Sequence, residues 1–251
     1  NKFKNNENIY NFNNRKYNFS ELVKINLNDY FGTDFNLNEF NKLISNEYMK
    51  KEELDYFKKM PVFGKTDRCS IFIQIYHKYF DNSDEFSNLY NKFIVEFIKP
   101  KFFPNEEYII VQKTPNLRVH IPNTSNLGKR ETDPNDKIIG VHYDAEFDHS
   151  NEEINLIIPL TEMFETNSIY HEYEINSNEN YEDYNNLQLE VNQIAFLYLN
   201  KWKHYNKINV TNKTRVSFDT RIIPYSKYTE SNLESITSKV KFSLGNYYIK
   251  L

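Results

Sequence analysis

The clearest structural pattern in this chain is the run RVSFDTRII at residues 215–223, in which charged or hydroxyl-bearing side chains recur at every second position from Arg215 to Arg221. In a β-strand, successive side chains point to opposite faces of the sheet. Arg215, Ser217, Asp219 and Arg221 therefore share one face, and the opposite face carries only Val, Phe, Thr and Ile. Because four polar side chains on one face do not suit a dry core, we expect this strand to line a polar site.

Residues upstream of this strand include a set suited to binding a metal ion. His142 and Asp144 are separated by one residue in the run IIGVHYDAE, and β alternation would place both on one face. His204 precedes Arg215 and Ser217 in the spacing His-x10-Arg-x-Ser. Two imidazoles and one carboxylate that leave other metal positions open form the arrangement found in non-heme Fe(II) sites that activate oxygen.

The two parts of this motif differ in specificity. With 6 His and 35 acidic residues in 251, about 0.8 His-x-Asp/Glu pairs are expected by chance, so the pair alone is uninformative. A downstream His-x10-Arg-x-Ser is expected on the order of 0.01 times. The conjunction of the two parts is therefore informative.

The order and spacing of HYD and HYNKINVTNKTRVSFDTR resemble the HxD…Hx10RxS pattern of Fe(II)/2-oxoglutarate-dependent oxygenases. The segments TPNLRVHIP, GVHYDAEFDHSNEEINLIIPLTEMFETNSI, NKTRVSFDTRIIP and LGNYY are also similar, in wording and order, to the oxygenase-like proteins of streptomycin biosynthesis gene clusters. This resemblance covers residues 108–248 and leaves the first hundred residues unaddressed.

The resemblance implies a fold and a reaction. The fold is a double-stranded β-helix, the jelly-roll or cupin-like core, in a mainly β chain with N-terminal helices (α+β). Fe(II) would be held by His142, Asp144 and His204, with 2-oxoglutarate chelating the iron and O2 taking the last position. The implied reaction is a dioxygenase hydroxylation that converts 2-oxoglutarate to succinate and CO2.

The resemblance also assigns cosubstrate contacts. Arg215 would pair with the distal carboxylate of 2-oxoglutarate, since a planar guanidinium matches a carboxylate with two hydrogen bonds. Ser217 would donate a further hydrogen bond. Asn155, a polar residue in the apolar run EINLIIPLT, needs a partner and is expected to bind the cofactor as well.

The polar face of the expected sheet suggests the kind of substrate. We expect Arg118, His120 and Arg221 to contact a small polar molecule, sugar-like or amino-acid-like, because an apolar substrate would leave such groups unpaired. For His120 a hydrogen-bonded strand histidine is an equal alternative. A protein or peptide substrate stays open. A non-catalytic cupin barrel and an epimerase-type cupin barrel also stay open as alternatives, although neither kind of barrel would need the Arg-x-Ser pair.

Other chemistries are less well supported by the sequence. Asp148 and His149, or His171, are alternative metal ligands, but the segment DAEFDHSNEE is turn-rich and acidic, which is typical of a solvated loop. The chain has no Gly-x-Ser-x-Gly elbow, and Cys69 lies in an apolar segment with helical spacing, which argues against a serine or cysteine nucleophile.

Composition and net charge limit the classes of binding partner and the cellular compartment that we expect. A net charge of -4 and a pI near 5.9 argue against a nucleic-acid or membrane-surface binder. The single cysteine excludes an internal disulfide and fits a reducing compartment, so we expect a cytoplasmic, intracellular protein. No apolar run approaches membrane-spanning length. Nothing in the sequence predicts the oligomeric state.

Periodicity predicts the element order. We expect residues 1–107 to form a helical region that packs on the barrel, and residues 108–251 to form the oxygenase core, together one compact domain. Helices are expected within 38–60, 67–80 and 83–100, and a polar loop at 123–137 is a candidate lid. Strands are expected within 23–31, 108–112, 117–122, 138–146, 153–161, 168–175, 191–200, 215–223 and 241–251.

Overall fold

The computed structural model describes residues 8–45, 47–52, 71–80, 83–123, 141–172, 184–235 and 239–251. Its helical elements are α1 (Phe19–Phe31), the 3-10 helix η1 (Leu37–Leu43), α3 (Ile71–Phe80), α4 (Asp84–Phe93), the π-helix η3 (Ile94–Ile98), α5 (Lys99–Phe102), and the 3-10 helices η4 (Asp144–Phe147), η5 (Glu165–Asn167) and η7 (Tyr225–Lys227). Its strands are β1 (Ile9–Asn11), β2 (Ile109–Gln112), β3 (Asn116–His120), β4 (Ile154–Pro159), β5 (Tyr170–His171), β6 (Asn185–Asn186), β7 (Gln193–Leu197), β8 (His204–Tyr205), β9 (Arg215–Pro224) and β10 (Tyr248–Lys250).

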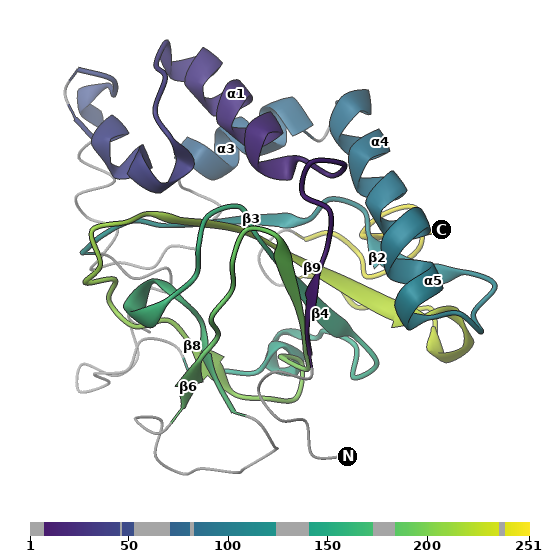
Figure 1. Cartoon of the computed structure of the whole chain (residues 1–251). Helices are drawn as coiled ribbons and strands as arrows, with labels where there is room; N and C mark the ends of the chain where they lie inside the picture. Colours follow the sequence, from purple (N-terminus) through teal and green to yellow (C-terminus); the bar gives the residue numbers. More distant parts are fainter. Residues whose placement is uncertain are drawn as a thin grey trace.

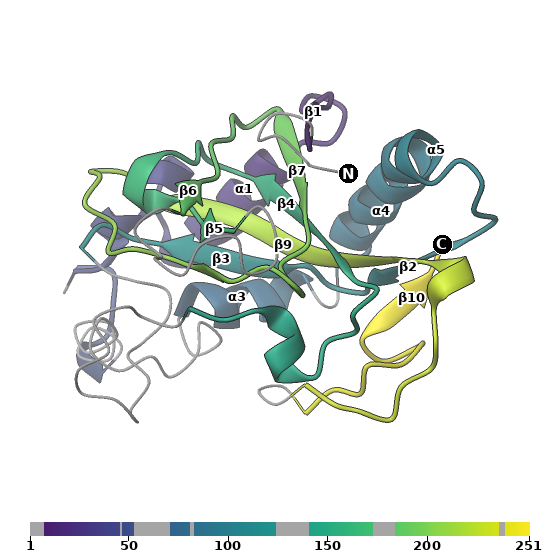
Figure 2. The ribbon, with the colours of Figure 1, turned by 90° about the horizontal axis from the view of Figure 1, so that it is seen from below.

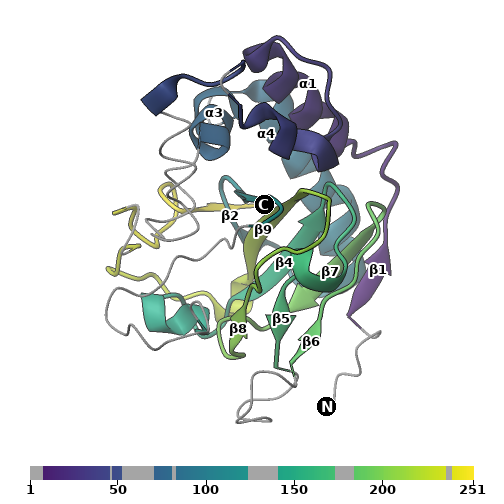
Figure 3. The same cartoon turned by 90° about the vertical axis from the view of Figure 1, so that its left-hand side faces the viewer.

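The described strands form two sheets. The large, 7-stranded sheet has the order β1-β7-β4-β9-β2-β10, with β3 also paired to β9, and the small sheet has the order β6-β5-β8. All pairs between these named strands are antiparallel. Figure 3 shows the layers, with the helices above the large sheet and the small sheet below it. The expectation of a β-rich fold with N-terminal helices is confirmed.

Strand β9 is the centre of the large sheet. β4 pairs along one edge, and β2 and β3 follow one another along the other edge. Figure 2 shows β9 running the length of the sheet, with β5 and β6 in front of it. Its apolar residues Val216, Phe218 and Ile222 are buried in the main hydrophobic core with side chains from α1, α3 and α4. The polar residues of β9 therefore face away from the helices, as the alternation predicts.

The register brings polar residues from three strands onto this second face. His120 pairs directly with Arg215 and Arg118 with Ser217, across β3 and β9. On the other side of β9, Asn155 of β4 pairs with Arg221. Directly opposite residues of an antiparallel pair have their side chains on the same face. The sheet thus presents a polar patch that is continuous across β3, β9 and β4.

The expected strand at residues 23–31 is wrong, because these residues belong to helix α1 (Figure 1). Asn18 caps the helix by accepting from the backbone N–H of Glu21, and Gly32, with φ 65°, ends it in the left-handed conformation. Val23 and Leu27 are buried at helical spacing, whereas Ile25 is 48% exposed. Tertiary packing of this helical face overrides the local alternation of VKINL.

The expected helix after residue 83 also extends further than its pattern predicts. Ser83 is the N-cap, as expected, and accepts from the backbone N–H of Phe86. Pro100 does not end the helix, because α4 passes through the π-helix η3 into α5. The N–H of Lys99 bonds to the carbonyl of Ile94, five residues back. The wider turn accommodates the proline ring, which would clash with a carbonyl in a regular α-helix.

Several other expectations have mixed outcomes. The helix expected within 67–80 is confirmed as α3 in its described part, whereas the described part of 38–60 begins with a 3-10 helix. The strands expected around β2, β3, β4, β7 and β9 are confirmed, and the one within 168–175 is the short β5. Of the strand expected within 241–251, only Tyr248–Lys250 (β10) forms a strand. Cys69, residues 53–60 and all but the first residue of the candidate lid lie outside the described residues. None of the described helices has the length and apolarity needed to cross a membrane.

Candidate metal centre

Backbone pairing places the two motif histidines side by side. His142 and His204 form an isolated antiparallel bridge, in which the N–H of His142 donates to the carbonyl of His204 at 3.2 Å and the reverse bond is 2.8 Å long. The two imidazole centroids are 4.3 Å apart. His204 lies on β8 of the small sheet, so this bridge attaches the segment at residue 142 to that sheet.

The expected strand over 138–146 is wrong beyond His142 in its described part. Tyr143 is extended, with φ -120° and ψ 147°, but Asp144 begins the 3-10 helix η4, which ends at Asp148 in the left-handed conformation. The N–H of Asp144 donates to the carbonyl of Leu199 at 2.7 Å instead of continuing a ladder with β8. The extended Tyr143 still separates His142 and Asp144, so their side chains point to the same side, as expected.

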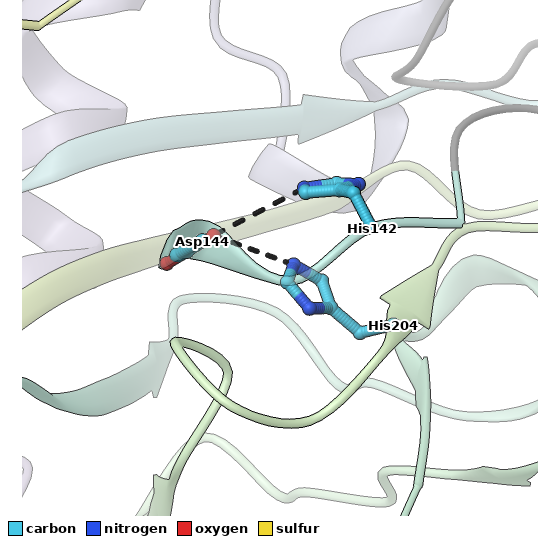
Figure 4. A group of neighbouring side chains, drawn as sticks. All are labelled: His142, Asp144 and His204. Atoms are coloured by element: carbon cyan, nitrogen blue, oxygen red, sulfur yellow. Dashed lines mark ion pairs between the residues drawn. The ribbon is translucent and has the colours of Figure 1, made fainter. Parts of the chain in front are cut away.

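The three side chains converge on one point, as Figure 4 shows. One carboxylate oxygen of Asp144, Oδ1, lies 3.6 Å from His204 Nε2 and 4.0 Å from His142 Nε2. One ligand atom from each residue lies within 4.8 Å of the others. Asp144 and His204 are buried and His142 is partly buried. Two imidazoles and one carboxylate fit a divalent transition metal, and the structure brings together the three residues that the motif predicted.

A hydrogen bond to the backbone fixes the tautomer of His204 that can bind a metal through Nε2. Its Nδ1 lies 3.1 Å from the backbone carbonyl of Trp202. Since a carbonyl oxygen only accepts, Nδ1 carries the proton and Nε2 presents its lone pair toward Asp144. Burial, followed by the proximity of His142, lowers the pKa of His204 to about 4, against the opposing charge of Asp144. The imidazole is therefore in the neutral form that a metal requires.

The second oxygen of Asp144 is held by two donors. Arg221 Nη2 donates to Oδ2 at 2.8 Å, and Asn155 Nδ2 donates to the same oxygen at 2.9 Å. Burial alone would raise the pKa of Asp144, but the positive charge of Arg221 is the chief reason that this pKa falls well below its usual range. Asp144 is therefore an anion, as a metal ligand must be.

Arg221 belongs to a buried ionic network that extends away from the triad. Its Nη1 lies 3.1 Å from Asp219 Oδ2 and 3.4 Å from Gln112 Oε1, and its Nε lies 3.7 Å from Glu153 Oε2. Arg118 contacts the same oxygen of Asp219 at 3.3 Å, and its side chain is 30% exposed. Of the two arginines expected to contact substrate, only Arg118 reaches solvent to this degree, because Arg221 is buried and engaged with carboxylates.

The remaining expected site residues lie on the same face of the sheet. Arg215 and Ser217 are both buried on β9. Arg215 Nη1 donates to Asn206 Oδ1 at 3.3 Å, so its guanidinium lies beside the chain that carries His204. His120 is fully buried, and its Nδ1 lies 3.2 Å from the carbonyl of Asn167. This placement is that of a hydrogen-bonded strand histidine.

The alternative metal ligands are engaged elsewhere. His149 Nδ1 lies 2.9 Å from Glu153 Oε2, and its ring packs on Phe242. His171 lies next to His204 in the small sheet, but its Nδ1 bonds to the carbonyl of Glu172 at 2.6 Å and its ring stacks on Trp202. Among the described residues, only the triad forms a group of three potential metal-binding side chains.

Sequence reasoning missed two participants in this region. Glu153 is completely buried and accepts hydrogen bonds from Tyr248 and His149. A charged residue at the start of the apolar run EINLIIP was a signal, because a buried carboxylate needs a cationic partner. Gln112 ends β2 and accepts from Arg221. Its role depends on the pairing of β2 with β9, which no local pattern predicts.

The chain is similar in sequence to a known protein of antibiotic biosynthesis. No protein-family model matches the chain. The chain is 28% identical over 174 residues to StrG, a streptomycin biosynthesis protein of Streptomyces griseus, covering 69% of this chain and 74% of StrG. This match agrees with the resemblance seen in segments such as TPNLRVHIP.

Similarity to solved structures is weaker. A nickel complex of the non-heme monooxygenase ThoJ has a TM-score of 0.42 and 12% identity, covering 86% of this chain and 72% of that chain. An iron-bound structure of HygX from Streptomyces hygroscopicus has a TM-score of 0.33 and 10% identity, covering 80% of this chain and 98% of HygX. Similarity of this degree leaves the function to be argued from the site itself.

Proposed function

We propose that this chain is an Fe(II)- and 2-oxoglutarate-dependent dioxygenase that hydroxylates a small polar molecule. The observation that carries the proposal is the convergence of His142, His204 and a single oxygen of Asp144 on one point. This donor set leaves the other side of a metal open for a chelating cosubstrate and O2. When bound, Fe(II), 2-oxoglutarate and O2 supply the oxidising chemistry, with release of succinate and CO2.

Arg215 and Ser217 are the proposed anchor for the distal carboxylate of 2-oxoglutarate. Both are buried on the face of β9 that also carries Arg221, the partner of Asp144. The contact of Arg215 with Asn206 supports the assignment, because Asn206 follows His204 closely in the chain. A buried, charge-assisted pair between a guanidinium and a carboxylate is strong and fixes the direction of the bound molecule.

We further propose that the two antiparallel sheets are the halves of a double-stranded β-helix. His204 lies on β8 of the small sheet, while the donors to Asp144 lie on β4 and β9 of the large sheet. The candidate metal centre is therefore attached to both sheets. This position supports a barrel whose interior holds the metal.

The proposed substrate is small and hydroxyl-rich or zwitterionic. Arg118, partly exposed and paired with Asp219, is the proposed substrate contact among the arginines of this face. His120 and Arg221, the other residues expected to contact substrate, are buried and bonded to Asn167 and Asp144, so they are left out of the proposed substrate contacts. The name of StrG, a biosynthesis protein, favours a small molecule over a protein substrate. The single cysteine supports an intracellular location.

Substrate-stimulated succinate formation tests this function. Purified protein with Fe(II), 2-oxoglutarate and O2 is incubated with pools of small polar metabolites and, separately, with peptide pools. We expect a metabolite pool to raise succinate formation by the wild-type protein, and no pool to raise it for Asp144→Ala. Stimulation by peptides alone would favour a peptide hydroxylase. Succinate formation no faster than in Asp144→Ala with every pool would contradict the assignment.

A further inference from the structure

We propose that Arg221 and Asn155 are positioning residues that restrict Asp144 to binding its metal through one oxygen. Both donate to Oδ2 of Asp144, at 2.8 Å from Arg221 Nη2 and 2.9 Å from Asn155 Nδ2. The other oxygen, Oδ1, is the one that faces the two imidazoles. One carboxylate oxygen is therefore hydrogen-bonded to the protein, and the other is the one placed to bind the metal.

The register of the sheet fixes both donors. Asn155 and Arg221 are directly opposite one another on β4 and β9, so their side chains leave the sheet side by side on the same face. Asn155 is completely buried and Arg221 is 3% exposed. Turning either donor away from Asp144 would break a buried hydrogen bond, which costs free energy.

The remaining contacts of Arg221 hold its guanidinium in place. Asp219 and Gln112 accept from Nη1, and Glu153 lies beside Nε, so Nη2 is left for Asp144. A planar guanidinium held at its other nitrogens presents the last one in a fixed direction. We therefore assign Arg221 to Asp144 and not to substrate.

The orientation of the Asn155 amide follows from charge. Rotation of the amide by half a turn would place Oδ1 against the carboxylate of Asp144, where two acceptors repel. Oδ1 is buried and has no hydrogen-bond partner among the described residues. Since 2-oxoglutarate offers only oxygen acceptors, this Oδ1 does not suit a direct contact with the cosubstrate. Asn155 is better explained as a donor to Asp144.

This inference rests on the proposed function, which supplies the metal. Within that function, binding of Asp144 through one oxygen determines how many metal positions stay open. A carboxylate with both oxygens available can bind a metal through two atoms and so fill an additional position. If Asp144 and the two histidines each contribute one atom, an octahedral metal keeps two positions for a chelating cosubstrate and one for O2. A second oxygen from Asp144 would fill one of these positions. Partners of a metal ligand beyond the metal itself commonly set its orientation and the affinity of the site.

Binding of Co(II) in the absence of cosubstrate tests the inference, because its visible absorption reports coordination number. The variants are Asn155→Val, which removes one donor, and Arg221→Lys, which keeps the charge but loses the planar fork. Asn28→Ala is the matched control, because Asn28 is a buried, hydrogen-bonded asparagine of α1, in the helical layer. We expect roughly 10- to 100-fold weaker Co(II) binding and an altered spectrum in Asn155→Val. Arg221→Lys should alter the spectrum in the same direction, and Asn28→Ala should keep the wild-type spectrum.

The outcomes separate the inference from the proposed function. A wild-type spectrum in Co(II)-saturated Asn155→Val overturns the inference, whatever its affinity, and if that variant does not fold, the spectrum of Arg221→Lys decides by the same criterion. A spectral change of equal size in Asn28→Ala also overturns it, since the effect would then be a general loosening of the fold. Wild-type protein that binds no Co(II) would contradict the metal site itself.

Discussion

His142 and His204 exchange both backbone hydrogen bonds of an antiparallel bridge, although they lie on separate segments of the chain. Their imidazoles are adjacent because the backbone is paired, and Asp144 is oriented by hydrogen bonds from Arg221 and Asn155. Backbone pairing and side-chain hydrogen bonds within the protein therefore fix the three groups relative to one another. Groups that are already fixed lose little conformational entropy on binding, so metal affinity should depend on the ligands themselves.

Binding of a divalent metal should stabilise the protein against heat. A ligand that binds only the folded state adds about 2.7 kcal/mol of stability at a concentration of 100 times its Kd. We expect Mn(II) to raise the Tm of the wild-type protein and a chelator to reverse the rise. In His204→Ala, Mn(II) should have no effect on Tm. Differential scanning fluorimetry under anaerobic conditions measures both.

The matched control for metal stabilisation is Asp148→Asn. Asp148 is an exposed acidic residue in the left-handed conformation, which asparagine tolerates, and it belongs to the alternative ligand set. This variant should keep the full rise in Tm with Mn(II). Loss of the rise in Asp148→Asn, with its retention in His204→Ala, would transfer the metal to the alternative ligands.

Replacing Arg215 by alanine should weaken 2-oxoglutarate binding. Loss of a charge-assisted, bidentate contact should cost roughly 2 to 4 kcal/mol, which is about a 30- to 1000-fold loss in affinity. Anaerobic titration calorimetry of 2-oxoglutarate into Mn(II)-loaded protein measures it. Lys213→Ala, a change at an exposed lysine just before β9, should leave the affinity unchanged. Wild-type affinity in Arg215→Ala would place the anchor elsewhere.

Glu153 should contribute strongly to the stability of the folded chain. It is buried, accepts from Tyr248 and His149, and lies beside Arg221, whereas its neighbour Glu152 is exposed and 3.6 Å from Lys227. Removing one partner of a buried charge network costs roughly 3 to 5 kcal/mol, so Glu153→Gln should lower the free energy of unfolding by that amount. Glu152→Gln should change it by less than about 0.5 kcal/mol. Urea denaturation of both variants compares them, and equal values would remove Glu153 from the network.

Local patterns were sufficient where the sheet determines the side-chain environment. The alternation in RVSFDTRII correctly divided β9 into a polar face and a core face, because each face has its own neighbours in β3 and β4. The motif spacing, together with the resemblance that it carries, also grouped His142, Asp144 and His204, and the structure brings them together. The first inference needed only the period of a strand, whereas the second also needed the resemblance to a known motif.

Local patterns failed where distant packing decides. Residues 23–31 alternate like a strand, yet Val23 and Leu27 bury one face of α1 against the core and leave Ile25 exposed. Asp144 leaves the expected strand because its N–H pairs with Leu199 and its side chain with Arg221. Leu199 lies in the turn after β7 and Arg221 lies on β9, so only the assembled sheets show that they meet Asp144.

We predict that the triad and Arg215 together bind Fe(II) and 2-oxoglutarate, and the visible charge-transfer absorption of that complex under anaerobic conditions measures this binding directly. A 2-oxo acid that chelates Fe(II) through its carboxylate and oxo group gives such a band, and Fe(II) alone does not. We predict that the band forms with wild-type protein, is absent with Asp144→Ala, and requires a higher 2-oxoglutarate concentration with Arg215→Ala. Failure of the band to form with iron-loaded wild-type protein at saturating 2-oxoglutarate would exclude an Fe(II)/2-oxoglutarate centre at these residues.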